Sequence, residues 1–258
     1  MSNSVAIVTG ASSGIGQATA LRLARDFAAI VLAARSGEKL AEVGQQVKAI
    51  GAEPLVLELD LMAATTAEVV VRKTLDRFGR IDALVNIAGA VAGLNVFEMT
   101  DEQWNVGMEL KFHGARRLTI HAWEALKESK GAVVFISGNA AIIPKAGAAA
   151  VGAINAAIEA LAKAFAERGI EDGVQVNSVS PGAIMTGRRL SMLEKIAASK
   201  MITLEETKQQ FLKQAGIARF GEAGEIADLI VHRLAGGALA DRHGASHGWR
   251  RSEVGLTG

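Results

Sequence analysis

Three glycines near the amino terminus have the spacing of a phosphate-binding turn. They follow the apolar run of residues 5–8 and open a stretch with helical character. Glycine permits positive φ angles and lets backbone N–H groups approach a phosphate, and the first turn of a helix adds partial positive charge. The spacing therefore predicts nucleotide binding, although a tight strand-to-helix turn without a ligand has the same glycines. The predicted contacts are Gly10, Ser12, Ser13, Gly14, Ile15 and Gly16.

Apolar runs and helical stretches alternate along the chain, and these elements must position the glycine turn. Parallel strands need crossover connections, so the alternation indicates a parallel sheet covered by helices on both faces. We predict an α/β fold, a Rossmann-type doubly wound parallel sheet in three layers, as a single domain over residues 1–258. The predicted strands are 5–8, 29–33, 54–59, 82–86, 132–137 and 174–179, and the predicted helices are 16–26, 39–50, 65–78, 102–128 and 148–168.

Two later segments depart from this alternation. Residues 187–221 form a mostly helical insertion, in which Thr203 and Glu206 have the spacing of a capping box. The insertion leaves the sheet just after the carboxyl end of a strand, where open α/β sheets bind their ligands. It is therefore predicted to be a substrate lid. Residues 241–258 are polar and glycine-rich, and they predict an irregular tail.

The composition argues against a nucleic-acid-binding protein, a disulfide-bonded protein and a membrane protein. The 28 basic and 27 acidic residues give a formal net charge of +1 without a long charge block, so no nucleic-acid-binding face is expected. The chain has no cysteine, which excludes disulfides and thiolate chemistry. The amino terminus lacks the pattern of a secretory signal, and charges and glycines interrupt the apolar runs. We expect a soluble cytoplasmic protein that does not enter a membrane.

Four motifs, in order along the chain, resemble the short-chain dehydrogenase/reductase family. Residues 9–16 resemble its Thr-Gly-x-x-x-Gly-x-Gly signature, and residues 86–89 resemble its Asn-Asn-Ala-Gly motif. Residues 59–61 are similar to its acidic turn beside adenine, and residues 177–186 to its Pro-Gly segment at the nicotinamide amide. The likeness spans nearly the whole chain and is strongest to a branch related to β-ketoacyl reductases. It implies an NAD(P)-binding domain with further cofactor contacts at Asp60, Leu61, Asn86, Ala88, Gly89, Asn155, Pro181, Gly182, Ile184 and Thr186.

The residues after the second predicted strand bear on which nicotinamide binds. An acidic residue there would accept hydrogen bonds from the ribose 2′-hydroxyl and repel a 2′-phosphate. This chain has Ala34 followed by Arg35 and Ser36. A guanidinium suits a phosphate group, so Arg35 and Ser36 predict NADP(H) in preference to NAD(H). An ordinary surface arginine at a strand end is the alternative.

The catalytic residues of the family are replaced. The family uses an asparagine, a serine, and a tyrosine and lysine four positions apart; the tyrosine exchanges the proton with the substrate oxygen. The matching positions in this chain are Lys111, Gly138, Val151 and Asn155. The chain contains no tyrosine at all. Loss of a positioned general acid costs about 10²–10⁴-fold in rate, so the site must be rebuilt or silent.

Three residues are candidate replacements in the catalytic site. The ammonium of Lys111 would donate a proton if it pointed into the pocket, because desolvation lowers the pKa of a lysine. The hydroxyl of Ser137 would donate a hydrogen bond to the substrate oxygen, and Asn155 would bond the nicotinamide ribose. The alternatives are a solvated Lys111 and a Ser137 bonded to the backbone.

The histidines do not predict a metal site. His113 lies two positions from Lys111, so on a helix the two side chains face apart. His243 and His247 have i,i+4 spacing, but Gly244 and Gly248 argue against the helix that a metal pair would need.

The alanine-rich helix predicted over residues 148–168 suits close packing against a second surface. In the family this helix and the one before it commonly form a four-helix dimer interface, so the resemblance implies a homodimer. Packing within the monomer alone is the alternative. The sequence does not decide between a dimer and a tetramer, because residues 244–251 lack the Asp-Gly-Gly ending that the family's tetramers often use.

Three hypotheses about function follow. The first is an NAD(P)(H)-dependent oxidoreductase that acts on a small apolar carbonyl or alcohol compound through a non-standard proton donor. The second is a catalytically silent protein that binds NADP(H) or a metabolite. The third is a structural subunit without a nucleotide, which the glycine turn disfavours. Arg188 and Arg189 near the predicted lid hint at an amphipathic or acidic substrate, although such pairs are often solvated.

Overall fold

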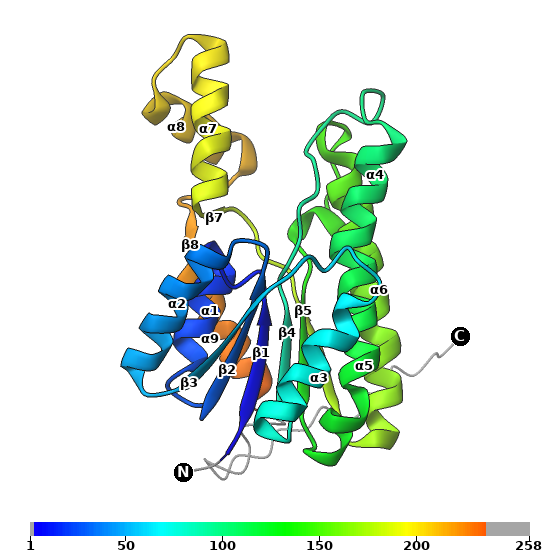
Figure 1. Ribbon diagram of the computed structural model, residues 1–258. Helices are drawn as coiled ribbons and strands as arrows, with labels where there is room; N and C mark the ends of the chain where they lie inside the picture. Colours follow the sequence, from blue (N-terminus) through cyan, green and yellow to red (C-terminus); the bar gives the residue numbers. More distant parts are fainter. Residues whose placement is uncertain (1–2, 236–258) are drawn as a thin grey trace, which may run out of the picture.

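The structure, a computed structural model, describes residues 3–235 and contains the predicted parallel sheet. Six strands lie in the order β3-β2-β1-β4-β5-β6, with helices on both faces (Figure 1). The prediction of a doubly wound α/β fold in three layers is confirmed. The strands are β1 (Val5–Thr9), β2 (Ala29–Ala34), β3 (Glu53–Glu58), β4 (Ala83–Asn86), β5 (Ala132–Ile136) and β6 (Gln175–Val179).

The strand order places a switch point between β1 and β4. From β1 the chain builds outward through β2 and β3, then returns to the other side of β1 and builds through β4, β5 and β6. All five pairings are parallel, and Val8 of β1 lies between Leu32 of β2 and Val85 of β4. In open α/β sheets, ligands bind outside the carboxyl ends of the strands at such a point.

Two apolar cores fill the space between the sheet and its helices. Successive side chains of a strand point to opposite faces, so a strand covered on both sides is apolar throughout. In β1, Ala6 and Val8 belong to one core, while Val5 and Ile7 belong to the other. Helices α1 (Gly14–Leu23), α2 (Gly37–Ile50) and α9 (Ala223–Leu234) contribute to the first core, and α3 (Thr66–Phe78), α5 (Gly114–Glu128) and α6 (Ala149–Asp172) to the second.

The helices agree with the sequence predictions within a few residues, with two additions. Helix α9 follows the lid and was not predicted, and the long predicted helix over 102–128 contains a turn of π-helix at Met108–His113. Such a turn inside an α-helix is frequent at functional sites. Helix α4 (Asp101–Gly107) ends where the π-helical turn begins, and α5 follows that turn.

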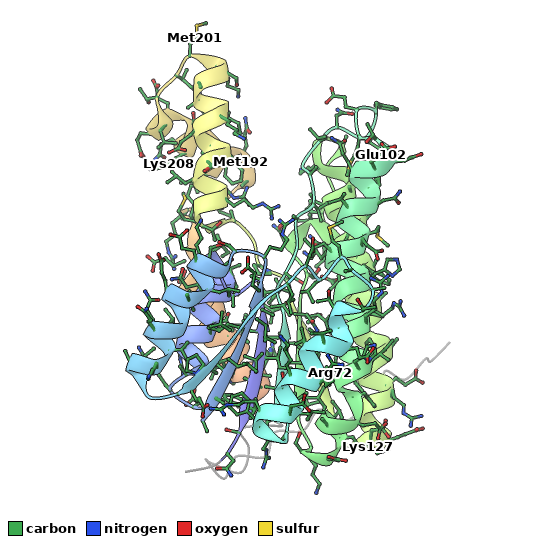
Figure 2. All side chains as sticks on the ribbon, in the orientation of Figure 1. Arg72, Glu102, Lys127, Met192, Met201 and Lys208 are labelled. Carbon is green, nitrogen blue, oxygen red and sulfur yellow. The ribbon has the colours of Figure 1, made fainter. Side chains whose placement is uncertain are left out.

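The insertion forms a helical pair above the carboxyl ends of the strands. Helices α7 (Gly187–Lys200) and α8 (Leu204–Ala215) extend from a small parallel pair, β7 (Ile184–Met185) and β8 (Gly221–Glu222). Thr203 and Glu206 form the predicted capping box, with reciprocal hydrogen bonds of 3.1 and 2.8 Å. Met201, at the tip, and Met192 and Lys208 mark this pair in Figure 2. The predicted tail over 241–258 lies outside the described residues.

Among residues 3–235, one helix has the length and composition of a membrane span. The segment Ala146–Asp172 contains a window with a mean hydropathy of 1.4, and glycines and charged residues interrupt the segment, as expected. The cause of this hydropathy is the alanine content of α6, which raises hydropathy without adding bulk. Ile154 and Ile158 of this helix are buried in the protein, as in a core helix that covers a sheet.

Candidate functional site

A cavity of about 770 Å³ lies at the switch point, above the carboxyl ends of β1, β2 and β4. Its walls come from the glycine turn, the end of β2, the segment after β4, the π-helical turn and the start of α7. Most of the predicted cofactor contacts line it. These residues are Gly10, Ser12, Ser13, Gly14, Ile15, Gly16, Arg35, Ser36, Leu61, Ala88, Gly89 and Thr186.

The glycine turn has the geometry of a phosphate cradle. Gly10 and Gly14 have φ angles of +66° and +56°, which disfavour residues with a side chain. A Cβ on Gly16 would lie 2.1 Å from the carbonyl oxygen of Gly10, so the turn closes only around a glycine. Helix α1 begins at Gly14, and its free N–H groups add positive potential. The turn therefore fits a nucleotide diphosphate.

Two basic side chains lie at the adenosine end of the cavity. Arg35 and Lys39 both line it and both are exposed. Lys39 was not predicted to line the cavity; its place in the first turn of the helix that follows Arg35 is the signal that could have found it. Glu58, at the end of β3, lies with its carboxylate against Gly37 and does not line the cavity. The two side chains give this end of the cavity a positive charge.

The other predicted cofactor contacts do not line this cavity. Asp60 accepts a hydrogen bond from the backbone N–H of Met62 at 3.0 Å, and Asn86 donates to Thr119 at 3.1 Å. These two side chains stabilise turns and strand ends around the cavity. Asn155, Pro181, Gly182 and Ile184 are also absent from its walls.

Lys111 occupies the π-helical turn and lines the cavity. Its ammonium donates hydrogen bonds to the side-chain oxygen of Asn155 at 2.5 Å and to the backbone oxygen of Ser137 at 3.2 Å. Its alkyl chain lies against Gly89, where a Cβ would be 3.1 Å from Cδ of the lysine. The structure thus brings Lys111 and Asn155 together, and the lysine does not extend into solvent.

The environment of Lys111 makes its ammonium easier to deprotonate than that of a lysine in water. Burial is the larger cause, and the positive charge of Arg188 is the second; together they lower the pKa of Lys111 to about 8. A lysine with a pKa near 8 exchanges protons readily at neutral pH, which an ordinary lysine does not. The arrangement can therefore donate a proton to an oxygen bound in the cavity.

Ser137 is oriented differently from the prediction. Its hydroxyl lies 3.0 Å from the backbone oxygen of Asn155 and 3.0 Å from Glu159, and not in the cavity. The neighbouring Ile136 lines the cavity, and alternation along β5 turns the next side chain away. The alternative of a Ser137 bonded within the protein is therefore the observed one. Glu159, which also accepts a 2.6 Å hydrogen bond from Ser180, was not singled out from the sequence.

The two remaining positions that the sequence predicts to match the family's catalytic set, 138 and 151, carry no polar side chain. A Cβ on Gly138 would lie 2.7 Å from the side-chain nitrogen of Asn155, so Asn155 fills the space of a side chain there. Val151 is half-buried in α6 and does not line the cavity. The only side chain of the four matching positions that reaches the cavity is thus Lys111.

No cluster of three or more metal-ligating side chains occurs among residues 3–235. His113 packs edge-on against Phe112, with a ring separation of 5.2 Å, and its Nδ1 is buried without a partner. His243 and His247 lie outside the described residues.

These features agree with a match between residues 4–196 and the family model for short chain dehydrogenases. The chain belongs to the short-chain dehydrogenase family. This short-chain dehydrogenase is related to ketoacyl reductases: it shares 32% identity over 228 residues with 3-oxoacyl-[acyl-carrier-protein] reductase of Synechocystis, covering 88% of this chain and 87% of the relative. Members of the family are nicotinamide-dependent oxidoreductases.

Solved structures with the same fold include complexes with either nicotinamide. L-sorbose reductase from Gluconobacter frateurii, complexed with NADPH and L-sorbose, superposes on this short-chain dehydrogenase with a TM-score of 0.85 at 28% identity, covering 89% of each chain. NAD⁺-bound xylitol dehydrogenase does so with a TM-score of 0.83 at 26% identity, covering 90% of this chain and 92% of the other.

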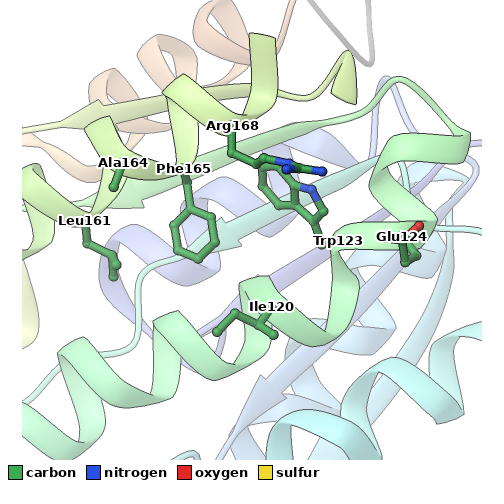
Figure 3. A pocket seen from close by; sticks show the side chains of 7 residues that line it. All are labelled: Ile120, Trp123, Glu124, Leu161, Ala164, Phe165 and Arg168. Atoms are coloured by element: carbon green, nitrogen blue, oxygen red, sulfur yellow. The ribbon is translucent and has the colours of Figure 1, made fainter. Parts of the chain in front are cut away.

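A second, apolar hollow lies on the outer face of α5 and α6 (Figure 3). It is formed around Trp123, Phe165 and Ile120, and the rings of Trp123 and Phe165 are 5.4 Å apart. The indole N–H donates to Asp172 at 2.7 Å, which fixes the tryptophan on the surface of the helix pair. This face contains no side chain of the cofactor cavity.

Proposed function

We propose that this protein is an NADP(H)-dependent oxidoreductase that interconverts a small carbonyl compound and its alcohol, with Lys111 as the proton donor in place of the family's tyrosine. One observation carries the proposal: a buried lysine with a pKa of about 8 lines the cofactor cavity. Asn155 and the backbone of Ser137 hold its ammonium in place. A positioned acid with a pKa near the working pH is what carbonyl reduction needs.

In the proposed reaction, some residues hold the cofactor and Lys111 transfers the proton. The glycine turn would hold the diphosphate of the cofactor, and Arg35 and Lys39 its 2′-phosphate. When bound, the nicotinamide would supply the hydride. As the carbonyl carbon gains its C–H bond, the π electrons of the carbonyl would move to the oxygen, and Lys111 would give that oxygen a proton. An ammonium has three N–H donors and two are engaged within the protein, which leaves one for the substrate. Water then returns the proton to the neutral amine.

The test is transfer of deuterium from NADPH labelled at C4 of the nicotinamide to the alcohol product, across a panel of carbonyl compounds. Incorporation of the label into product supports the oxidoreductase. NADPH binding by calorimetry, without transfer to any compound, would instead support a silent cofactor-binding protein. Absence of NADPH binding would support a structural subunit.

The pH dependence follows from the pKa of Lys111. The protonated lysine is the donor, so kcat/KM for reduction falls as pH rises through about 8. Asn155→Asp places a carboxylate against the ammonium and raises the pKa of Lys111, by about 1–3 units for such a neighbour. We expect the alkaline limb of the reduction profile to move to higher pH by that amount. Asn105→Asp, at an exposed position of α4, should leave the limb in place.

The cofactor preference rests on the two cations beside β2. Arg35→Gln removes a charged hydrogen-bond donor to the 2′-phosphate, which is worth about 1.5–3 kcal/mol. We expect the Kd for NADPH, measured by calorimetry, to rise about 10- to 150-fold, with little change in the Kd for NADH. Lys48→Gln removes a charge from the far end of α2 and serves as the control. An equal loss of affinity for both cofactors would argue against NADP(H) preference.

The proposal also includes the partner and the compartment. The apolar hollow around Trp123 and Phe165 supports a homodimer that buries the outer face of α5 and α6. Trp123→Glu should convert that dimer to monomer in sedimentation velocity, because it puts a charge into the buried face.

We place the reaction in the cytoplasm, where NADPH is produced and consumed.

A further inference from the structure

Arg188 lies at the start of the lid helix α7 and crosses to the other side of the cofactor cavity. Its guanidinium donates a hydrogen bond to the backbone oxygen of Gly89 at 3.1 Å, although 99 positions separate the two residues. Gly89 is also the residue against which the alkyl chain of Lys111 packs. The guanidinium of Arg188 and the alkyl chain of Lys111 therefore contact the same residue, and both side chains line the same cavity.

The two cations have no anionic partner within the described residues. Lys111 bonds an amide oxygen and a carbonyl oxygen, and Arg188 bonds a carbonyl oxygen. Six of the other twelve arginines among residues 3–235 are paired with carboxylates. The paired residues are Arg22, Arg77, Arg80, Arg117, Arg168 and Arg219.

Proximity of two like charges costs free energy, and here it contributes to the lowered pKa of Lys111. An anion bound between them would remove that cost and would satisfy the free donors of the guanidinium. Arg189 does not share this role, because its guanidinium stacks on Phe211 at 5.1 Å within the lid and does not line the cavity.

We propose that Arg188 binds an anionic group of the substrate, so that the substrate is a carbonyl compound that also carries a carboxylate or a similar acidic group. The carbonyl would lie at Lys111 and the acidic group at Arg188. This inference rests on the proposed function for the carbonyl, but the anion site itself does not. Arg188 on the lid helix thus selects substrates with a negative charge, and Lys111 in the π-helical turn donates the proton.

A cofactor phosphate is the other source of such an anion. The glycine turn provides the cradle for the diphosphate, and Arg35 and Lys39 lie at the adenosine end. Arg188 instead bonds the residue that contacts Lys111, at the end of the cavity where proton transfer would occur. The position favours a substrate group, and the experiment below separates the two sources.

The experiment measures equilibrium binding to the protein saturated with NADP⁺, and uses 4-oxopentanoate and 4-oxopentanamide as probes. The two differ in charge and share their carbon skeleton. We expect the acid to bind at least about tenfold more tightly than the amide, the size of one good charge-assisted contact. In Arg188→Gln the ratio should fall to about 1. Lys200→Gln, which removes a charge from the opposite end of α7, should keep the ratio of the unaltered protein.

Calorimetry with NADPH alone completes the test. Equal binding of acid and amide to the unaltered protein overturns the inference. A large loss of NADPH affinity in Arg188→Gln, with an unchanged acid-to-amide ratio, also overturns it and assigns the guanidinium to the diphosphate. A preference for the acid that depends on Arg188 supports the anion site, whether or not deuterium is transferred. If the preference is found but no deuterium is transferred to any compound, the proposed oxidoreductase is rejected and the protein is one that binds an acidic metabolite.

Discussion

Lys111→Met is expected to lower kcat for carbonyl reduction about 10²- to 10⁴-fold, the contribution of a positioned general acid. Methionine keeps much of the alkyl chain that packs against Gly89, and it removes the ammonium that bonds Asn155 and Ser137. The Kd for NADPH should change little, because the predicted phosphate contacts lie in other walls of the cavity. Steady-state kinetics and calorimetry on the same preparation separate the two effects.

The pH profile distinguishes loss of an acid from loss of structure. The residual activity of Lys111→Met should no longer fall as pH rises through about 8, since the titrating group is gone. The variant leaves a buried amide oxygen unpaired, which costs about 1–3 kcal/mol, so a thermal melt should accompany the kinetics. Lys163→Met, at an exposed site of α6, is the control. An unchanged kcat in Lys111→Met would show that another group donates the proton.

The fold could be predicted because its signals are local. Each central strand is an apolar run, since both of its faces are buried, and each crossover helix has its own periodicity. The glycine turn is equally local: three spaced glycines suffice to close it. The capping box at Thr203 is formed by residues three positions apart, and it lies where the sequence placed it.

The chemistry of the site could not be predicted in the same way, because it depends on contacts between distant residues. The hydrogen bond of Lys111 to Asn155 joins positions 44 apart, and that of Arg188 to Gly89 joins positions 99 apart. The sequence indicated that Lys111 had replaced an asparagine, but the partner of its ammonium follows only from the packing of α6. The orientation of Ser137 was missed for a related reason: one position along a strand turns a side chain to the opposite face.

Three of the four positions that the sequence matches to the family's catalytic set are in contact with one another. Gly138 leaves room for the amide of Asn155, and that amide in turn holds the ammonium of Lys111. A side chain at position 138 would collide with the amide at 2.7 Å. A change at any one of these three positions would therefore disturb the contacts of the other two.

Gly16→Ala is expected to disrupt the cofactor end of the protein as strongly as Lys111→Met disrupts the catalytic end. The added Cβ would lie 2.1 Å from the carbonyl oxygen and 2.6 Å from the carbonyl carbon of Gly10, and both are backbone atoms that move only if the turn opens. Overpacking of this kind costs about 1–3 kcal/mol of folding free energy, and displaced N–H groups no longer converge on a phosphate. Calorimetry should show NADPH binding weakened by at least about tenfold, and a thermal melt should show a lower Tm.

Gly224→Ala is the matched control, because no atom lies within 4 Å of its Cβ and the change restricts the unfolded chain. If Gly16→Ala melted and bound NADPH like Gly224→Ala, the turn would not be the phosphate cradle, and the nucleotide would have to bind elsewhere in the cavity.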